Sequence, residues 1–113
     1  MKIGINGFGR IGRSVAKICL ERNIQIGAIN DIHGAQSAAY LFKHDSIYQK
    51  FSGTVESKQN SVVINKKEIP ILAEINPEKI PWKKYGVDVV VESTGVFRKK
   101  ADAARHLLGG AKY

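Results

Sequence analysis

Short apolar runs alternate with longer amphipathic segments along this chain, and the alternation predicts a β-α-β order of elements. Residues 1–6 form the first short run, with Ile3 and Ile5 apolar, and predict a strand. From Arg10 to Glu21 the apolar residues fall at helical spacing. They are Ile11, Val15, Ile18 and Leu20, with Ala16 and Cys19 between them. We therefore expect a strand, a turn and a helix at the start of the chain.

The pattern then repeats with a second strand and a second helix. Residues 24–30, IQIGAIN, predict the strand. In the segment that follows, HGAQSAAYLFKHDS, the residues Ala38, Ala39, Leu41 and Phe42 give a helix its buried side. This completes a second βα unit.

Residues 51–86 follow a different pattern. Two short β-rich pieces, Val62–Asn65 and Ile69–Ala73, are joined by polar turns, which predicts a small antiparallel excursion before the next parallel strand. Further on, Asn76 is a candidate N-cap, Pro77 a candidate first helical residue and Gly86 a stop, so we expect one short helix here.

The last segments predict a buried strand and a final helix. Residues 87–95, VDVVVESTG, are nearly continuously apolar before their polar end, which is typical of a central parallel strand buried on both faces. Ser93, Thr94 and Gly95 would then lie at its carboxyl end, where open α/β sheets bind ligands, although a plain strand-to-loop turn would give the same letters. A helix from about Lys100 to Leu108 would normally lead to another parallel strand, and none follows. The fold class is therefore α/β, a Rossmann-like, doubly wound, mostly parallel sheet, incomplete at its C-terminus.

Three glycines between the first strand and the first helix carry the candidate chemistry. Gly7, Gly9 and Gly12 fit the pattern G-x-G-x-x-G. In a dinucleotide site the first allows a tight turn, the second lets a pyrophosphate approach the backbone and the third lets helix and strand pack closely. The backbone amides of Arg10 and Ile11 would then open the helix toward the phosphates.

An acidic residue completes this fingerprint. Asp31 follows the second strand, about 20 residues beyond the glycine turn, where a carboxylate accepts hydrogen bonds from the adenosine ribose. A carboxylate there repels a 2′-phosphate, which favours NAD over NADP as the cofactor. A structural glycine turn with an incidental aspartate is the alternative interpretation.

Composition narrows the remaining possibilities. The formal net charge is +8, but the cations are scattered in short groups and form no basic stripe that interleaves with aromatic residues, so solvated surface lysines are favoured over a dedicated nucleic-acid site. No apolar run is long enough to span a bilayer, and there is no secretion signal, so we expect a cytoplasmic location and no membrane partner. Cys19 is the single cysteine, which excludes an internal disulfide and a cysteine-based metal site.

The segments INGFGRIGR, INDIHG, LFKHDS, VVVESTGVF and HLLGGAK, in this order, resemble the NAD-binding half of phosphorylating glyceraldehyde-3-phosphate dehydrogenase. The resemblance covers the whole chain and implies a domain of residues 1–113 that is truncated before the catalytic domain. It implies that the backbone at Arg10 and Ile11 meets the pyrophosphate and that Asp31 meets the ribose. It places the backbone near Ile75 against the adenine, and the residues Thr94, Gly95 and Phe97 along the adenine and ribose wall. A related subfamily that acts on erythrose 4-phosphate tends to have Glu and C-T-G where this chain has Asp31 and Ser93.

Two features limit what the resemblance implies. The family often has an arginine where this chain has Ile75, so a side-chain contact with adenine at that position is in doubt. The family's catalytic cysteine belongs to an S-C-T-T-N type motif that this chain lacks, and Cys19 falls within an apolar helical stretch and is interpreted as an inert, packed thiol. The histidines, His33, His44 and His106, are interpreted as surface or helix-cap residues. The chain therefore has no predicted catalytic residue and no predicted metal ligand.

Two hypotheses about function remain. In the first, these residues are the NAD-binding part of a complete glycolytic dehydrogenase, typically a homotetramer, whose small phosphorylated aldehyde substrate binds only in the full-length protein. In the second, they are a free-standing or truncated nucleotide-binding module without redox activity. A basic binder of RNA is a weaker third reading, and it would show binding that collapses with salt.

Overall fold

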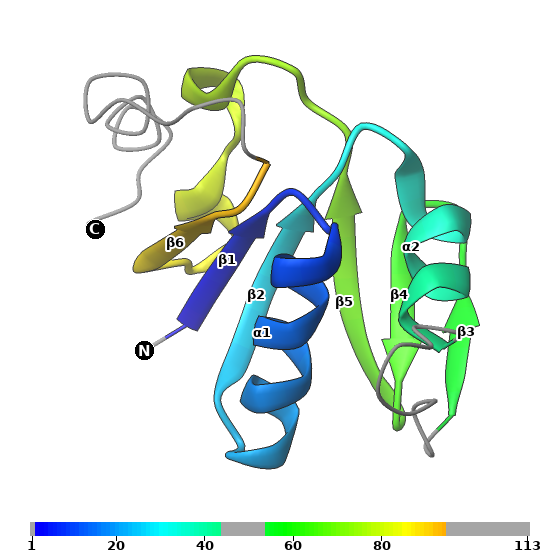
Figure 1. The fold of residues 1–113 in the computed structure, drawn as a ribbon. Coiled ribbons are helices and arrows are strands. Elements are labelled where there is room, and N and C mark those ends of the chain that lie inside the picture. The colour runs from blue at the N-terminus through cyan, green and yellow to red at the C-terminus, as the bar shows by residue number, and fades with distance from the viewer. Residues whose placement is uncertain (1, 44–53, 95–113) are drawn as a thin grey trace.

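A single six-stranded sheet organises the chain in the computed structural model, which describes residues 2–43 and 54–94 (Figure 1). The strands are β1 (Lys2–Asn6), β2 (Gln25–Asn30), β3 (Val55–Ser57), β4 (Ser61–Ile64), β5 (Lys67–Leu72) and β6 (Val89–Glu92). The helices are α1 (Arg10–Glu21) and α2 (Gly34–Lys43), and two 3₁₀ turns follow, η1 (Pro77–Lys79) and η2 (Trp82–Tyr85). The strands lie in the order β3-β4-β5-β2-β1-β6.

The parallel part of the sheet matches the sequence prediction closely. β1 pairs in parallel with β2 and with β6, and β2 pairs in parallel with β5. The predicted first helix is confirmed as α1 over the same residues, and the second as α2. The α/β, Rossmann-like class with a mostly parallel sheet is thus confirmed.

The antiparallel excursion is also present, although it is built differently from the prediction. β3 pairs with β4 and β4 with β5 in antiparallel fashion, and Asn65 and Lys66 turn between the last two with positive φ. β5 then lies beside β2 as its parallel neighbour, so the excursion ends within the strand that rejoins the parallel sheet. The next parallel strand along the chain, β6, follows the excursion as predicted, but the parallel pairing of β5 with β2 was not predicted.

Two other local predictions need correction. The single helix expected over residues 77–86 is a pair of 3₁₀ turns, because Pro81 between them cannot donate a backbone hydrogen bond and disfavours helical geometry at the residue before it. Gly86, in the left-handed region, does end the second turn as expected. Strand β6 is half-buried and forms an edge of the described sheet rather than a strand buried on both faces. The helix predicted over residues 100–108 lies outside the described residues.

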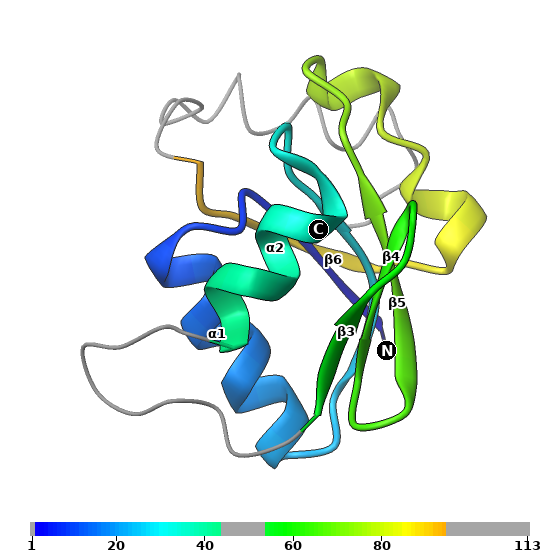
Figure 2. The same cartoon turned by 90° about the vertical axis from the view of Figure 1, so that its right-hand side faces the viewer.

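The two faces of the sheet carry different cores. Helices α1 and α2 lie together on one face, and the 3₁₀ turns lie on the other (Figure 2). Phe42 and Ile5 belong to the cluster under the helices, whereas fully buried Trp82 packs with Ala28 and Val87 on the opposite face. Trp82 therefore covers this second face of the sheet. At 12 residues α1 is the longest helix in the described part of the chain, and no helix there is long and apolar enough to cross a membrane.

The burial of Cys19 leads to a first testable prediction. The residue is 2% exposed, and this burial raises the pKa of its thiol above the ordinary value. The thiol therefore stays protonated at neutral pH. The effect of this shift on stability is absent below the ordinary pKa of the thiol, and stability falls as the pH rises from that value through the elevated pKa of the folded chain. We expect iodoacetamide to label the folded chain far more slowly at pH 8 than the same chain unfolded in urea. Equal labelling rates in the two states would contradict an inert, packed thiol.

Candidate functional site

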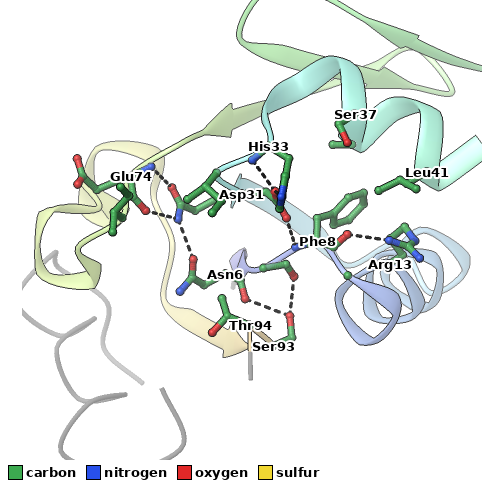
Figure 3. A pocket seen from close by; sticks show the side chains of 16 residues that line it. Asn6, Phe8, Arg13, Asp31, His33, Ser37, Leu41, Glu74, Ser93 and Thr94 are labelled. Atoms are coloured by element: carbon green, nitrogen blue, oxygen red, sulfur yellow. Dashed lines mark hydrogen bonds and ion pairs between the residues drawn. The ribbon is translucent and has the colours of Figure 1, made fainter. Parts of the chain in front are cut away.

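A pocket of about 490 Å³ opens where the parallel strands end (Figure 3). Its volume falls in the range of pockets that bind small molecules and cofactors. It lies beyond the carboxyl ends of β1, β2 and β6, which is where open α/β sheets bind their ligands. The lining residues are Asn6, Gly7, Phe8, Gly9, Arg13, Asn30, Asp31, Ile32, His33, Ser37, Ala38, Leu41, Glu74, Ile75, Ser93 and Thr94.

Packing within the protein explains two of the three glycines in the turn. Gly7 has a φ of +92°, and a Cβ there would lie 2.8 Å from the backbone nitrogen of Thr94. A Cβ on Gly12 would overlap the carbonyl oxygen of Gly7 and come within 3.2 Å of Ile5. The close approach of α1 to β1 therefore requires glycine at this position. Ser93 ties this turn to β6, because its hydroxyl donates to the carbonyl oxygen of Gly7 at 2.6 Å.

Gly9 is different, because nothing in the protein lies within 4 Å of the position its Cβ would occupy. Its φ of −80° is accessible to any residue, so neither backbone strain nor packing requires glycine here. Gly9 is the N-cap of α1, and the first backbone amide with an intrahelical partner is that of Arg13, which donates to the Gly9 carbonyl at 2.9 Å. The open space next to Gly9 therefore adjoins amides that a helix leaves without intrahelical partners, an arrangement that suits an anion.

The carboxylate of Asp31 is fixed at the mouth of the pocket by backbone amides. Its Oδ2 accepts a hydrogen bond from the amide of Phe8 at 2.7 Å, and its Oδ1 accepts one from the amide of His33 at 2.8 Å. The Nδ1 atom of His33 lies 2.9 Å from the same Oδ1. The Asp31 side chain is 15% exposed, so the carboxylate is held in place yet reachable from the pocket. A carboxylate in this position suits the hydroxyl groups of a ribose.

A row of buried polar side chains forms the floor of the pocket. Asn30 donates from Nδ2 to Oδ1 of Asn6 at 2.8 Å and to the carbonyl of Glu74 at 2.9 Å, and its Oδ1 accepts from the Glu74 amide at 2.8 Å. Asn6 in turn donates from Nδ2 to Oε1 of Glu92 at 2.8 Å. Asn6 and Asn30 are each 3% exposed. The row thus crosses the ends of three parallel strands.

The sequence analysis did not identify this row, although a signal for it was present. Asn6, Asn30 and Glu92 are each the last residue of their strand, and the strand register places Asn6 opposite both of the others. Polar residues ending apolar parallel strands at the same level indicate side chains that meet at the sheet edge. Arg13 was not predicted as a site residue either, and its guanidinium donates to the Phe8 carbonyl at 3.0 Å in the pocket wall.

The structure brings together most of the predicted cofactor-binding residues. Those that line the pocket are Gly7, Gly9, Asp31, Ile75 and Thr94. Arg10, Ile11 and Gly12 form the first turn of α1 beside it without lining it, and Ile75 is 74% exposed. Gly95 and Phe97, like His44 and His106, lie outside the described residues. His33 is a surface residue as predicted, but it also lines the pocket.

The donor set of the pocket suits a dinucleotide. The pocket combines open backbone at Gly9, the start of a helix, and a fixed carboxylate at Asp31. In residues 2–43 and 54–94 no three metal-ligating side chains lie close enough to hold an ion. The thiol of Cys19 is buried and is not among the lining residues. The arrangement can bind and orient a ligand.

Comparison with known proteins agrees with the family resemblance of the sequence. Residues 1–100 match the family model described as the NAD-binding domain of glyceraldehyde 3-phosphate dehydrogenase. Over 98% of its length the chain is 50% identical to glyceraldehyde-3-phosphate dehydrogenase of Thermotoga maritima, and over 99% it is 48% identical to that of Geobacillus stearothermophilus. The chain spans 34% of the length of each of these curated relatives.

Proposed function

The chain belongs to the glyceraldehyde 3-phosphate dehydrogenase family, with NAD as the cofactor of its domain, and from this we propose that the pocket at the strand ends is where NAD binds. The observation that carries the proposal is the open space at Gly9. Packing accounts for the other two glycines of the turn, whereas neither packing nor backbone strain requires glycine at position 9, where the missing side chain leaves the backbone open to a ligand.

Each part of the pocket has a proposed role toward NAD. The backbone amides of Arg10 and Ile11 bind the pyrophosphate, and the start of α1 adds a favourable dipole. Asp31 accepts hydrogen bonds from the adenosine ribose. The backbone at Ile75, which lines the pocket, contacts the adenine. Thr94, with Gly95 and Phe97, completes the wall.

The reaction is proposed for the polypeptide that combines this domain with a catalytic half. There an aldehyde is oxidised and phosphorylated to an acyl phosphate, and bound NAD supplies the chemistry by accepting a hydride. The residues of this chain bind and orient the cofactor. A chain of these 113 residues alone should bind NAD without turnover, because Cys19 is its single cysteine and is buried.

The cellular setting is proposed from the family as well. We propose a cytoplasmic, glycolytic enzyme that assembles as a homotetramer and takes a small phosphorylated aldehyde, with no dedicated nucleic-acid partner. The intact mass of the natural protein distinguishes this from a free-standing nucleotide-binding module. A mass well above 12.5 kDa supports the dehydrogenase, and a mass matching this chain supports the module.

Substitution of Asp31 tests the choice between NAD and NADP. Asp31→Asn keeps the size of the side chain and removes the negative charge that disfavours a 2′-phosphate. It also leaves the new NH₂ group facing the backbone amide of either Phe8 or His33. We expect NAD affinity to fall about 10-fold and the preference for NAD over NADP to narrow by about the same factor, as loss of one charge-assisted hydrogen bond implies. Isothermal titration calorimetry with both cofactors measures the two effects.

The matched control is Glu56→Gln, which removes the same charge from an exposed position on β3. It should leave both affinities unchanged. Unchanged NAD affinity and an unchanged cofactor preference in Asp31→Asn would remove Asp31 from the site.

A further inference from the structure

We propose that Glu92, which does not line the pocket, is a positioning residue whose carboxylate holds Asn6 in the orientation that continues the row from Asn30, and that the completed row fixes opposite walls of the pocket together. The inference rests on the proposed function, because it concerns the same NAD site. Glu92 lies at the end of β6, and the Glu74–Ile75 segment lies beyond β5, on the far side of β1 and β2. The row of hydrogen bonds described above joins them.

The side-chain hydrogen bonds of the row all point the same way, from Asn30 through Asn6 to Glu92. At one end the backbone of Glu74 both donates to Asn30 Oδ1 and accepts from Asn30 Nδ2, which fixes that amide in one orientation. Asn30 then donates to Asn6, and Asn6 donates to Glu92. A carboxylate without a proton is acceptor-only, so Glu92 is suited to receive the last bond of the series.

Glu92 also holds the wall of the pocket that Thr94 forms. Its Oε2 accepts from the backbone amide of Thr94 at 3.0 Å and from the Thr94 hydroxyl at 2.7 Å. Thr94 lies against the glycine turn, where its backbone nitrogen occupies the space that a Cβ on Gly7 would need. The Glu92 carboxylate thus binds the Thr94 wall directly, and it is linked to the Glu74–Ile75 wall through Asn6 and Asn30.

The substitution Glu92→Gln replaces one acceptor oxygen by an NH₂ donor group without changing the shape of the side chain. If the glutamine oxygen faces Asn6, its NH₂ group faces the Thr94 amide, which is also a donor. If the NH₂ group faces Asn6, two donors meet there, and turning Asn6 and Asn30 to relieve the clash only moves it to the Glu74 backbone. Each of these arrangements leaves one donor facing another, at the exposed Thr94 amide in the first and at part-buried groups in the others. The uncharged glutamine also binds its donors more weakly than a carboxylate does.

Exchanging the two functional groups restores the pairings of Asn30, position 6, position 92 and Thr94 described above. In the double variant Asn6→Asp with Glu92→Gln, the carboxylate at position 6 accepts from Asn30 and from the new glutamine, whose oxygen accepts from Thr94. The charge and the atom count are those of the original pair. Asn6→Asp alone places two carboxylates in contact, so each single variant should be impaired and the double variant restored.

The test is a cycle of the two single variants and the double variant, with Glu56→Gln as the control for charge. Two readouts are used, NAD affinity by calorimetry and hydrogen exchange of the Glu74 amide by NMR in the absence of NAD. We expect each single variant to bind NAD about 10-fold more weakly and to exchange the Glu74 amide about 10-fold faster. The double variant should return to within about threefold of the original chain in both, as non-additivity of contacting residues requires.

Unchanged exchange at Glu74 in Glu92→Gln, or no recovery in the double variant, would overturn the positioning role. Should the single variants fail to fold, recovery of folding by the double variant supports the role and continued failure overturns it. If the exchange results hold but the original chain binds no NAD, the positioning role stands and the proposed function fails.

Discussion

Gly9→Val should abolish most NAD binding while the chain stays folded. The valine Cβ meets no protein atom within 4 Å, and the backbone at Gly9 has an extended conformation that a β-branched residue adopts without strain. The side chain therefore projects into pocket space. If the pyrophosphate lies there, both of its bonds to the first helical amides are lost, and affinity should fall by about 100-fold or more.

The stability of the same variant provides its internal control. Glycine is a better N-cap than valine, so the free energy of unfolding should fall by about 1 kcal/mol or less. Gly9→Ala should behave in the same direction with a smaller loss of affinity, since it adds only one methyl group. Calorimetry with NAD and denaturation in urea measure both quantities. Normal NAD affinity in a folded Gly9→Val chain would show that no ligand approaches this backbone.

Gly12→Ala, unlike the substitutions at Gly9, should mainly destabilise the fold. A Cβ at Gly12 overlaps the carbonyl oxygen of Gly7, a backbone atom of the turn that cannot simply rotate away. α1 must therefore move off β1, and overpacking of this kind costs about 1–3 kcal/mol, occasionally more. We expect the urea midpoint to drop accordingly.

The comparison between positions 9 and 12 separates the two roles within one motif. The same methyl group is added in Gly9→Ala and Gly12→Ala, yet only the second should lower the free energy of unfolding substantially. Equal losses of stability at the two positions would contradict the close approach of α1 to β1.

The regular elements of this fold were predictable because their residues obey simple periodicities. α1 shows apolar residues at helical spacing, and β2 is an apolar run bounded by a turn and a polar residue, so both were found with correct or nearly correct bounds. The motif from Gly7 to Gly12, together with Asp31, identified the pocket because its residues lie within two consecutive units of the chain.

Features that depend on contacts between distant segments were not predictable in the same way. The bonds from Asn6 to Glu92 and from Asn30 to Glu74 join residues 86 and 44 positions apart. The strand order that brings them together is a property of the whole sheet. Pro81 also divided a segment that local capping signals had suggested was one helix.

The central claim is that NAD binds at the glycine turn, and titration of the 113-residue chain with NAD, followed by ¹H–¹⁵N NMR, tests it most directly. The account predicts saturable shifts concentrated at the amides of Gly9, Arg10, Ile11 and Asp31, and their loss in Gly9→Val. A folded chain with no shifts at NAD concentrations of about 1 mM, equivalent to about 4 kcal/mol of binding free energy, or with shifts confined to other surfaces, would contradict it.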